Sequence, residues 1–490
     1  MKIRIKYLLI SLLLVVNISC SEWLDLIPPN GLIREEFWQV KEDVESVLMA
    51  AYDKFASMDA DLFLRGELRA DLLARGTNQP LNEQNIMESN IFPDNPYCNW
   101  SSFYSIINYC NEVIINAPFV QEIDNTFTDF KLKSLVAEAY FLRSLSYFYL
   151  VRIYKDVPLA LEPFEKDNSD FYMAKSTEEE ILDQIVSDLE TNREFALTEG
   201  FPTIEINKGR ASKAAFDALL ADIELWRFNY DAVLTHVERI EITEKYELMP
   251  AANWFDIFYP GNSLESIFEL QHDANLDQSN NIYGIVSRFS NRYFASQTAI
   301  NMFAYEYNQQ EVVRGEKATI TKIGEDQYSI WKPVGQAPDG TSVRSGSEQR
   351  SANWIVYRYA DVLLMKAEAL SQLERFDEAL VYINLIKGRA GLPMGPIPNS
   401  ATAFEDAIME QRALELAFEG KRWFDLLRLG RRNDFARKSK LIEIIVSNVP
   451  STQKRILAAK LTDPMGWYLP VFETEIERNR NMEQNPFYDY

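Results

Sequence analysis

Asp217-Ala-Leu-Leu-Ala-Asp-Ile-Glu224 aligns without gaps on Asp361-Val-Leu-Leu-Met-Lys-Ala-Glu368, and this internal repeat decides the fold. After each copy, an aromatic residue followed by aspartate opens a second predicted helix, at Tyr230-Asp231 and at Phe376-Asp377. A unit that recurs in this form indicates pairs of helices that stack on their neighbours. The repeat therefore predicts a mostly α fold built from helical hairpins.

Two small residues, Ala232 and Ala379, follow the start of each second helix, where we expect the helices of a hairpin to approach closely. Large apolar residues around a small one are typical of tetratricopeptide-like hairpins. Residues 137–145 form a looser third copy. Because the copies are interrupted, we expect a helical scaffold that carries other segments, and not a simple solenoid.

Further helices are indicated by apolar residues that recur every three or four positions. One helix is expected over 128–154, and the next begins at Thr177, which forms a capping box with Glu180. Two more helices are indicated by the apolar sets Val44, Val47, Leu48, Ala51, Tyr52, Phe55 and Phe103, Ile106, Ile107, Cys110, Val113, Ile114.

Two stretches lack this period and are rich in Asn, Gln, Ser, Gly and Pro. The longer covers about 241–352, and the shorter covers 76–100. We therefore predict a helical scaffold over 41–240 and 353–490 with a loop-rich insertion between them. Long loops on a rigid frame are where binding residues usually lie, so the ligand surface is expected there.

The N-terminus has the order of a bacterial lipoprotein signal. Lys2, Arg4 and Lys6 precede a short apolar run that ends at Ser19-Cys20. The run is too short to span a bilayer. By its resemblance to a lipobox, residues 1–19 are a signal peptide, Cys20 carries the lipid, residues 20–40 form the lipidated end and an extended tether, and 41–490 form the body. A plain signal peptide with an incidental cysteine is the alternative.

The chain is strongly acidic, with a net charge of −23 over 490 residues, which becomes −26 once three basic residues leave with the signal peptide. Such a field repels nucleic acid, so a nucleic-acid partner is not expected. The basic cluster near the C-terminus is interpreted as a set of structural ion pairs; its members are Lys421, Arg422, Arg428, Arg431 and Arg432.

The motifs of most enzyme classes are absent from the sequence. The two histidines, His236 and His272, stand in different contexts, and no cluster of ligands has the spacing of a metal site. We expect no cofactor, no metal and no catalytic residue. With 73 acidic residues, a glycan-cleaving carboxylate pair stays open as an alternative. Whether Cys98 and Cys110 form a disulfide also stays open.

Three segments carry a family resemblance. Asn353-Trp-Ile-Val-Tyr-Arg-Tyr-Ala-Asp-Val-Leu-Leu-Met-Lys-Ala-Glu-Ala369 resembles the central motif of the SusD/RagB family, and Glu410-Gln-Arg-Ala-Leu-Glu-Leu-Ala-Phe-Glu-Gly-Lys-Arg-Trp-Phe-Asp-Leu426 resembles its most recognisable signature. The segment from Tyr468 to Tyr488 is similar to the family's end, with Phe487 where the family often has glycine. Glu415, Glu419 and Arg422 are expected to form an ion-pair ladder on successive turns of one helix.

This resemblance implies a function. Members of the family are surface lipoproteins of the outer membrane that bind glycans, or in some cases peptides, and cap a SusC-like, TonB-dependent β-barrel transporter. The resemblance thus implies a nutrient-binding protein that is not an enzyme. A peptide-binding member, a glycan-cleaving enzyme of the same pathway and a periplasmic scaffold are the alternatives.

The ligand surface is expected to combine aromatic rings, which stack on sugars, with polar side chains that bind hydroxyl groups. Trp100 has an alternative role, because Tyr104 follows it by four positions and the pair could anchor a helix. The candidates that flank the shorter insertion are Asp71, Arg75, Phe92, Asn95, Tyr97 and Trp100, and those from the longer one are Tyr283, Tyr293 and Trp331.

Overall fold

The computed structural model describes residues 37–164, 172–197, 201–307, 314–332 and 350–489. Helices dominate these ranges, as the repeat predicts. None of the helices described there combines the length and the apolar composition that a membrane span requires.

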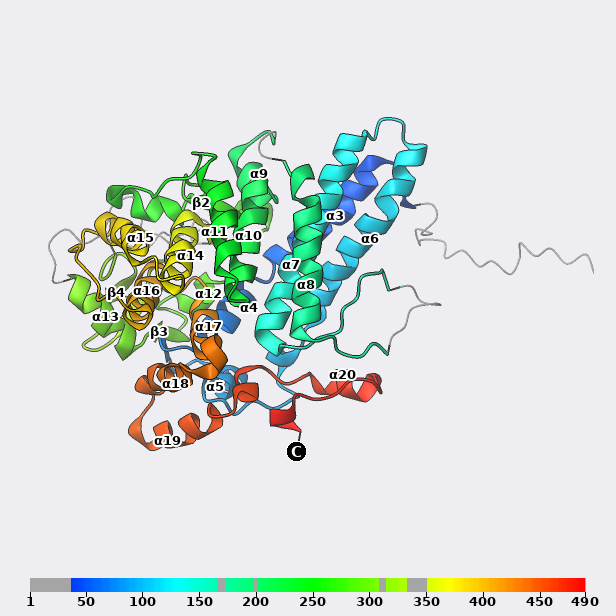
Figure 1. Ribbon diagram of the computed structural model, residues 1–490. Coiled ribbons are helices and arrows are strands. Elements are labelled where there is room, and N and C mark those ends of the chain that lie inside the picture. Colours follow the sequence, from blue (N-terminus) through cyan, green and yellow to red (C-terminus); the bar gives the residue numbers. More distant parts are fainter. Residues whose placement is uncertain (1–36, 165–171, 198–200, 308–313, 333–349, 490) are drawn as a thin grey trace, which may run out of the picture.

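Four long helices form one side of the molecule (Figure 1): α3 (Lys41–Ala56), α6 (Ser101–Ile123), α7 (Asp129–Tyr154) and α8 (Glu178–Asn192). α6 packs against α3 and α7, and α7 packs against α8. The predicted helix over 128–154 is confirmed, and so is the capping box at Thr177.

The repeat forms two hairpins on the other side: α10 (Lys213–Trp226) with α11 (Tyr230–Glu241), and α14 (Tyr359–Gln372) with α15 (Phe376–Arg389). The second helices begin at Tyr230 and Phe376, as predicted. α14 also packs against α11 and against α16 (Ala401–Glu415), so the hairpins stack side by side (Figure 1).

One detail of the predicted crossing is wrong. Ala379 is fully buried in an apolar cluster with Phe404 and Ile408, but Ala232 is only half-buried. Val233 is the fully buried residue at the start of α11. The two hairpins therefore share their topology without sharing the small residue at the crossing.

The remaining elements are short. The three strand pairs are each antiparallel: β1 (Leu73–Arg75) with β3 (Tyr293–Ala295), β2 (Ser266–Leu270) with β6 (Trp354–Arg358), and β4 (Ile320–Lys322) with β5 (Tyr328–Ile330). The other helices are α4 (Asp59–Glu67), α5 (Leu81–Met87), α9 (Ile204–Gly209), α12 (Tyr283–Val286), α13 (Gln297–Tyr307), α17 (Arg422–Phe435), α18 (Lys438–Ser447), α19 (Ser451–Lys460) and α20 (Glu473–Arg478), and the short 3-10 turns are Pro96–Cys98, Arg193–Phe195, Ala251–Ile257, Ala274–Leu276, Pro464–Trp467 and Pro486–Tyr488.

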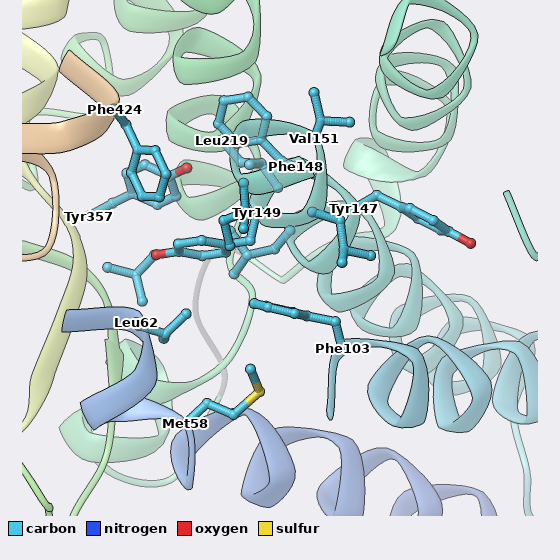
Figure 2. Packing of buried hydrophobic residues seen from close by; sticks show 14 of the residues in the cluster. Met58, Leu62, Phe103, Tyr147, Phe148, Tyr149, Val151, Leu219, Tyr357 and Phe424 are labelled. Carbon is cyan, nitrogen blue, oxygen red and sulfur yellow. The ribbon is translucent and has the colours of Figure 1, made fainter. Parts of the chain in front are cut away.

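Aromatic rings join α6, α7 and α17 within one apolar cluster (Figure 2). The rings of Phe103 and Tyr149 stack with centroids 6.0 Å apart, and Phe424 meets Tyr149 edge-on at 6.2 Å. These contacts connect α6, α7 and α17 across more than 300 positions of sequence. Such pairs add to the stability that burial of their area supplies.

The segment between α16 and α17 does not continue the helix, so the predicted ion-pair ladder is wrong. Phe418 and Gly420 have φ of 62° and 71°, which turns the chain away from the helix axis. Gly420 is required there, because a Cβ would lie 2.8 Å from the Trp354 ring. Glu415 and Glu419 instead bind Arg358, each at 2.8 Å, and all of these groups are buried. The two glutamates of the signature segment thus connect the end of α16 and the following turn to Arg358 of β6.

Cys98 and Cys110 are both buried free thiols, so the structure contains no disulfide between them. Burial raises the pKa of each thiol to about 12. His236 is also buried, 3.6 Å from a Glu190 carboxylate oxygen, in the packing role that its helix position suggests.

Candidate ligand-binding site

The two loop-rich insertions meet on one surface. β1 pairs with β3 in the register Leu73 to Ala295 and Arg75 to Tyr293. The ladder continues beyond the strands, because the N–H of Gly76 donates to the Arg292 carbonyl at 2.9 Å. Backbone bonds thus hold residues of the shorter insertion against residues more than 200 positions later.

A buried carboxylate organises this surface. Glu83, on α5, accepts hydrogen bonds from the Tyr97 hydroxyl, from the Tyr293 hydroxyl at 2.6 Å and from Nε of Arg292 at 2.9 Å. Burial, with the bond to Glu83, raises the pKa of the Tyr97 hydroxyl above its usual value. Both tyrosines are therefore neutral hydroxyl donors over the physiological range, and the bond to Glu83 orients the Tyr97 ring.

Tyr97 and Arg292 lie at one end of an open groove. The first lobe has a volume of about 400 Å³ and is lined by Ser57, Ala60, Asp61, Leu64, Tyr97, Asn281, Gly284, Ile285 and Arg292. The second lobe has about 740 Å³ and is lined by Ser46, Met49, Ala50, Tyr52, Asp53, Ala56, Ser57, Gly209, Leu270, Gln271, His272, Asp277, Gln278, Ser279 and Asn281. Because Ser57 and Asn281 line both, the lobes are adjacent, and we call them together the polar groove.

Asp59 binds Asn281, one of the two residues that line both lobes. Its carboxylate is fully buried at the start of α4 and accepts from the backbone N–H of Asn281 at 2.6 Å and from its side-chain amide at 3.0 Å. Nε2 of His272 lies 3.7 Å from the same carboxylate. Burial lowers the pKa of His272 despite the nearby charge of Asp59. The imidazole is therefore neutral near pH 7.

The structure brings part of the predicted cluster to this surface. Tyr97 lines the polar groove, and the buried Tyr293 shares Glu83 with it. Tyr283 is half-buried beside Asn280, whose side-chain oxygen accepts from its N–H. Arg75 is exposed, 3.6 Å from Glu88, and 60% of Phe92 is exposed. Neither Arg75 nor Phe92 lines the polar groove.

The other predicted residues are buried and hold the frame. Asp71 is 1% exposed and binds Arg422, and Asn95 caps the turn at Tyr97, whose N–H donates to it at 3.1 Å. Trp331 is 3% exposed and packs against Phe255.

Trp100 is equally buried, and its ring lies 5.8 Å from that of Tyr104, in the anchoring role considered for it. The edge of Trp100 borders a separate depression of about 490 Å³, which also contacts Tyr109, Phe164 and Met482. The segment 97–100 thus lies between two hollows, with Tyr97 on the polar groove and Trp100 on the other.

Sequence reasoning missed the groups that shape the polar groove. Glu83, Arg292 and Asp59 belong to no local motif. Glu83 binds Arg292, and Asp59 binds Asn281, and each contact spans more than 200 positions of sequence. Asn281 ends the polar run Asp277-Gln-Ser-Asn-Asn, so composition marked its loop but not its position in the site.

Comparisons with known proteins agree with this architecture. A model described as the SusD family matches residues 246–488, and one described as starch-binding associating with outer membrane matches 22–225. The SusD-like protein P38 of Formosa agariphila is 27% identical over 99% of this chain and 98% of its own. The SusD-like protein P2 of the same organism is 27% identical over 97% and 98%.

Solved structures share the fold over most of the chain. A SusD superfamily protein from Bacteroides vulgatus has a TM-score of 0.75 at 20% identity and covers 92% of this chain and 100% of its own. A laminarin-binding SusD-like protein has a TM-score of 0.71 at 21% identity, with coverage of 92% and 100%. Two family models, full-length relatives and the helical-hairpin fold agree, and the chain belongs to the SusD/RagB family.

Proposed function

We propose that this protein captures a glycan outside the cell and delivers it to a SusC-like, TonB-dependent transporter of the outer membrane. Membership of the SusD family and a matching model described as associating with the outer membrane support this function. The laminarin-binding neighbour indicates that this fold can present a glycan site.

The observation that carries the proposal is the polar groove. It places the oriented ring of Tyr97 beside amide, hydroxyl and carboxylate groups in an open hollow of oligosaccharide size. A sugar presents C–H faces that stack on an aromatic ring and hydroxyl groups that pair with such polar side chains.

Capture requires no chemistry on the ligand. The carboxylates nearest the junction of the lobes are engaged within the protein, Asp59 with Asn281 and Asp61 with Nε of Arg65 at 2.7 Å. We therefore assign them to the frame of the groove and not to an acid–base pair. Release of new reducing ends from a bound glycan would instead establish the glycan-cleaving alternative.

The predictions for the N-terminus complete the proposal. Cys20 and most of the tether lie outside the described residues, so they rest on the sequence. We propose that residues 1–19 are removed, that Cys20 carries the lipid, and that the scaffold over 41–240 and 353–490 presents the insertion at 241–352 to the outside.

The test is a glycan array probed with the chain from Ser21, followed by calorimetry on the glycan that binds. We expect Tyr97→Ala to weaken binding roughly ten- to a hundredfold, while Tyr97→Phe, which keeps the ring, loses much less. Tyr109→Ala, in the separate depression, is the matched control. If Tyr109→Ala weakens glycan binding and Tyr97→Ala does not, the binding site is that depression and not the polar groove. If the chain binds peptides but no glycan, its ligand is a peptide.

A further inference from the structure

The charged residues of the polar groove are almost all acidic. Asp53, Asp61 and Asp277 line it, and Arg292 is the cation among the described lining residues. Asp59 is buried and binds Asn281, which lines both lobes. A groove with this balance has a negative electrostatic potential unless each acid has a partner.

The ion pairs among the described residues do not neutralise the excess of negative charge in the groove. Arg292 is neutralised by Glu83, which it binds through two nitrogens, and Asp61 is neutralised by Arg65. The partner of Asp59 is His272, whose imidazole is neutral near pH 7 because burial lowers its pKa. Asp53 and Asp277 form no ion pair with the described residues. Three negative charges therefore remain around the groove.

We infer that the polar groove selects uncharged glycans and rejects glycans that carry carboxylate or sulfate groups. A uronate or sulfate entering it would lose water without meeting a free cation, and it would be repelled by Asp53, Asp59 and Asp277. This inference rests on the proposed function, because it names the class of ligand that the same site binds.

A neutral sugar would meet complementary groups instead. Its hydroxyls can donate to the carboxylates of Asp53 and Asp277. The side chains of Gln278 and Ser279 line the same lobe and can form hydrogen bonds with a sugar as well. Hydrogen bonds to a charged acceptor are stronger than neutral ones, so the same acids that repel an anion bind a hydroxyl well.

Distance separates this local effect from the charge of the whole chain. The net charge of −23 repels polyanions at low salt, but at physiological ionic strength the Debye length falls to about 8 Å. Only charges close to the ligand act strongly under those conditions. Selectivity that persists at physiological ionic strength therefore reports on the charges of the groove.

The experiment compares one polysaccharide in two charge states. The chain from Ser21 is run in native gels that contain laminarin, starch, xylan or mannan, and the polysaccharide that retards it is then oxidised at C6 or carboxymethylated. We expect the charged form to bind at least roughly tenfold more weakly in physiological salt. Equal binding of the two forms, or retardation by alginate or chondroitin sulfate, would overturn the inference while leaving glycan capture intact.

Paired variants locate the effect. The double variant Asp53→Asn with Asp277→Asn should reduce the ratio of the affinities for the neutral and the charged polysaccharide by a factor on the order of three to ten. Asp183→Asn with Glu378→Gln removes the same number of charges from the exposed scaffold and should leave this ratio unchanged. If this control variant reduces the affinity ratio equally, the charges of the groove do not cause the selectivity. If no polysaccharide in any form binds, the proposed function itself falls.

Discussion

At the scale of single residues, Asp71 shows how the frame uses its charges. Its carboxylate is 1% exposed and accepts from Nε of Arg422 at 2.8 Å and from Nη2 at 3.1 Å. Removing one partner of a buried pair leaves a charge without compensation, which costs about 3–5 kcal/mol. We predict that Arg422→Met lowers the free energy of unfolding by about this amount in urea denaturation.

The double variant Asp71→Asn with Arg422→Met should recover much of that loss, because no unpaired charge remains. Arg375→Met, at an exposed pair with Glu378, serves as the control and should have no measurable effect. A double variant as unstable as Arg422→Met would show that packing of the guanidinium, and not the charge, explains the loss.

Glu67 makes the stability of the fold depend on pH. Burial raises the pKa of its carboxyl to about 8, although the N–H of Gly420 donates to it at 2.9 Å. An acid whose folded-state pKa lies above its unfolded value stabilises the fold fully below the unfolded value. That contribution is lost as the pH rises from about 4.5 to 8.

Glu67→Gln keeps an acceptor for Gly420 and removes the titration. We predict that the variant gains stability over the wild type as the pH rises from 5 to 8, by roughly 2–4 kcal/mol. Guanidinium denaturation of both proteins at each pH measures the difference. A difference that stays constant across this range would show that Glu67 ionises normally in the folded state.

At the scale of elements, the hairpin α14–α15 depends on a small residue. Ala379 is fully buried among Phe404, Ile408 and Ile383, so a larger side chain has no space. We predict that Ala379→Leu lowers the free energy of unfolding by about 1–3 kcal/mol, because overpacking forces side chains and backbone to shift. Ala232→Leu, at the half-buried position of α11, should change it much less, and equal effects would contradict this difference between the hairpins.

Element type could be predicted from the sequence where a local signal exists. Periodic apolar residues indicated α7, and the Thr177–Glu180 box fixed the start of α8, because both signals act within a few residues. The break after Glu415 was missed, because it depends on Gly420 fitting against Trp354, a contact that no helical period contains.

The candidate site could be predicted only in part for the same reason. Composition located the insertions, and Tyr97 was among the candidates that line the polar groove. Whether Asp71 or Trp331 faces solvent depends on partners far along the chain, Arg422 for the first and Phe255 for the second. Local patterns do not encode such partners.

At the scale of the whole molecule, the lipid anchor can be tested directly. We predict that Cys20→Ala releases the protein from the membrane fraction of cells that lack the transporter, because the acyl chains are then the anchor that the variant has lost. Fractionation with a high-salt wash measures this, with the wild type as control. A variant that remains in membranes after the wash would rule out Cys20 as the anchor.

The transporter complex is the second prediction at this scale. A lid must cover its barrel through a large face, well above roughly 1,000 Å² of buried area. Mild detergent extraction followed by affinity capture should therefore recover a much larger outer-membrane protein with this chain. Recovery of the chain alone in several mild detergents would contradict the partnership.

The ladder of β1 with β3 has a consequence for how such proteins diversify. It holds the two insertions together through backbone groups, which are the same for every amino acid. Substitutions among the exposed side chains of the two insertions can then accumulate without disturbing the register that holds the insertions together. A few substitutions of exposed side chains can therefore change the glycan that such a protein binds, while its buried residues and its fold stay the same.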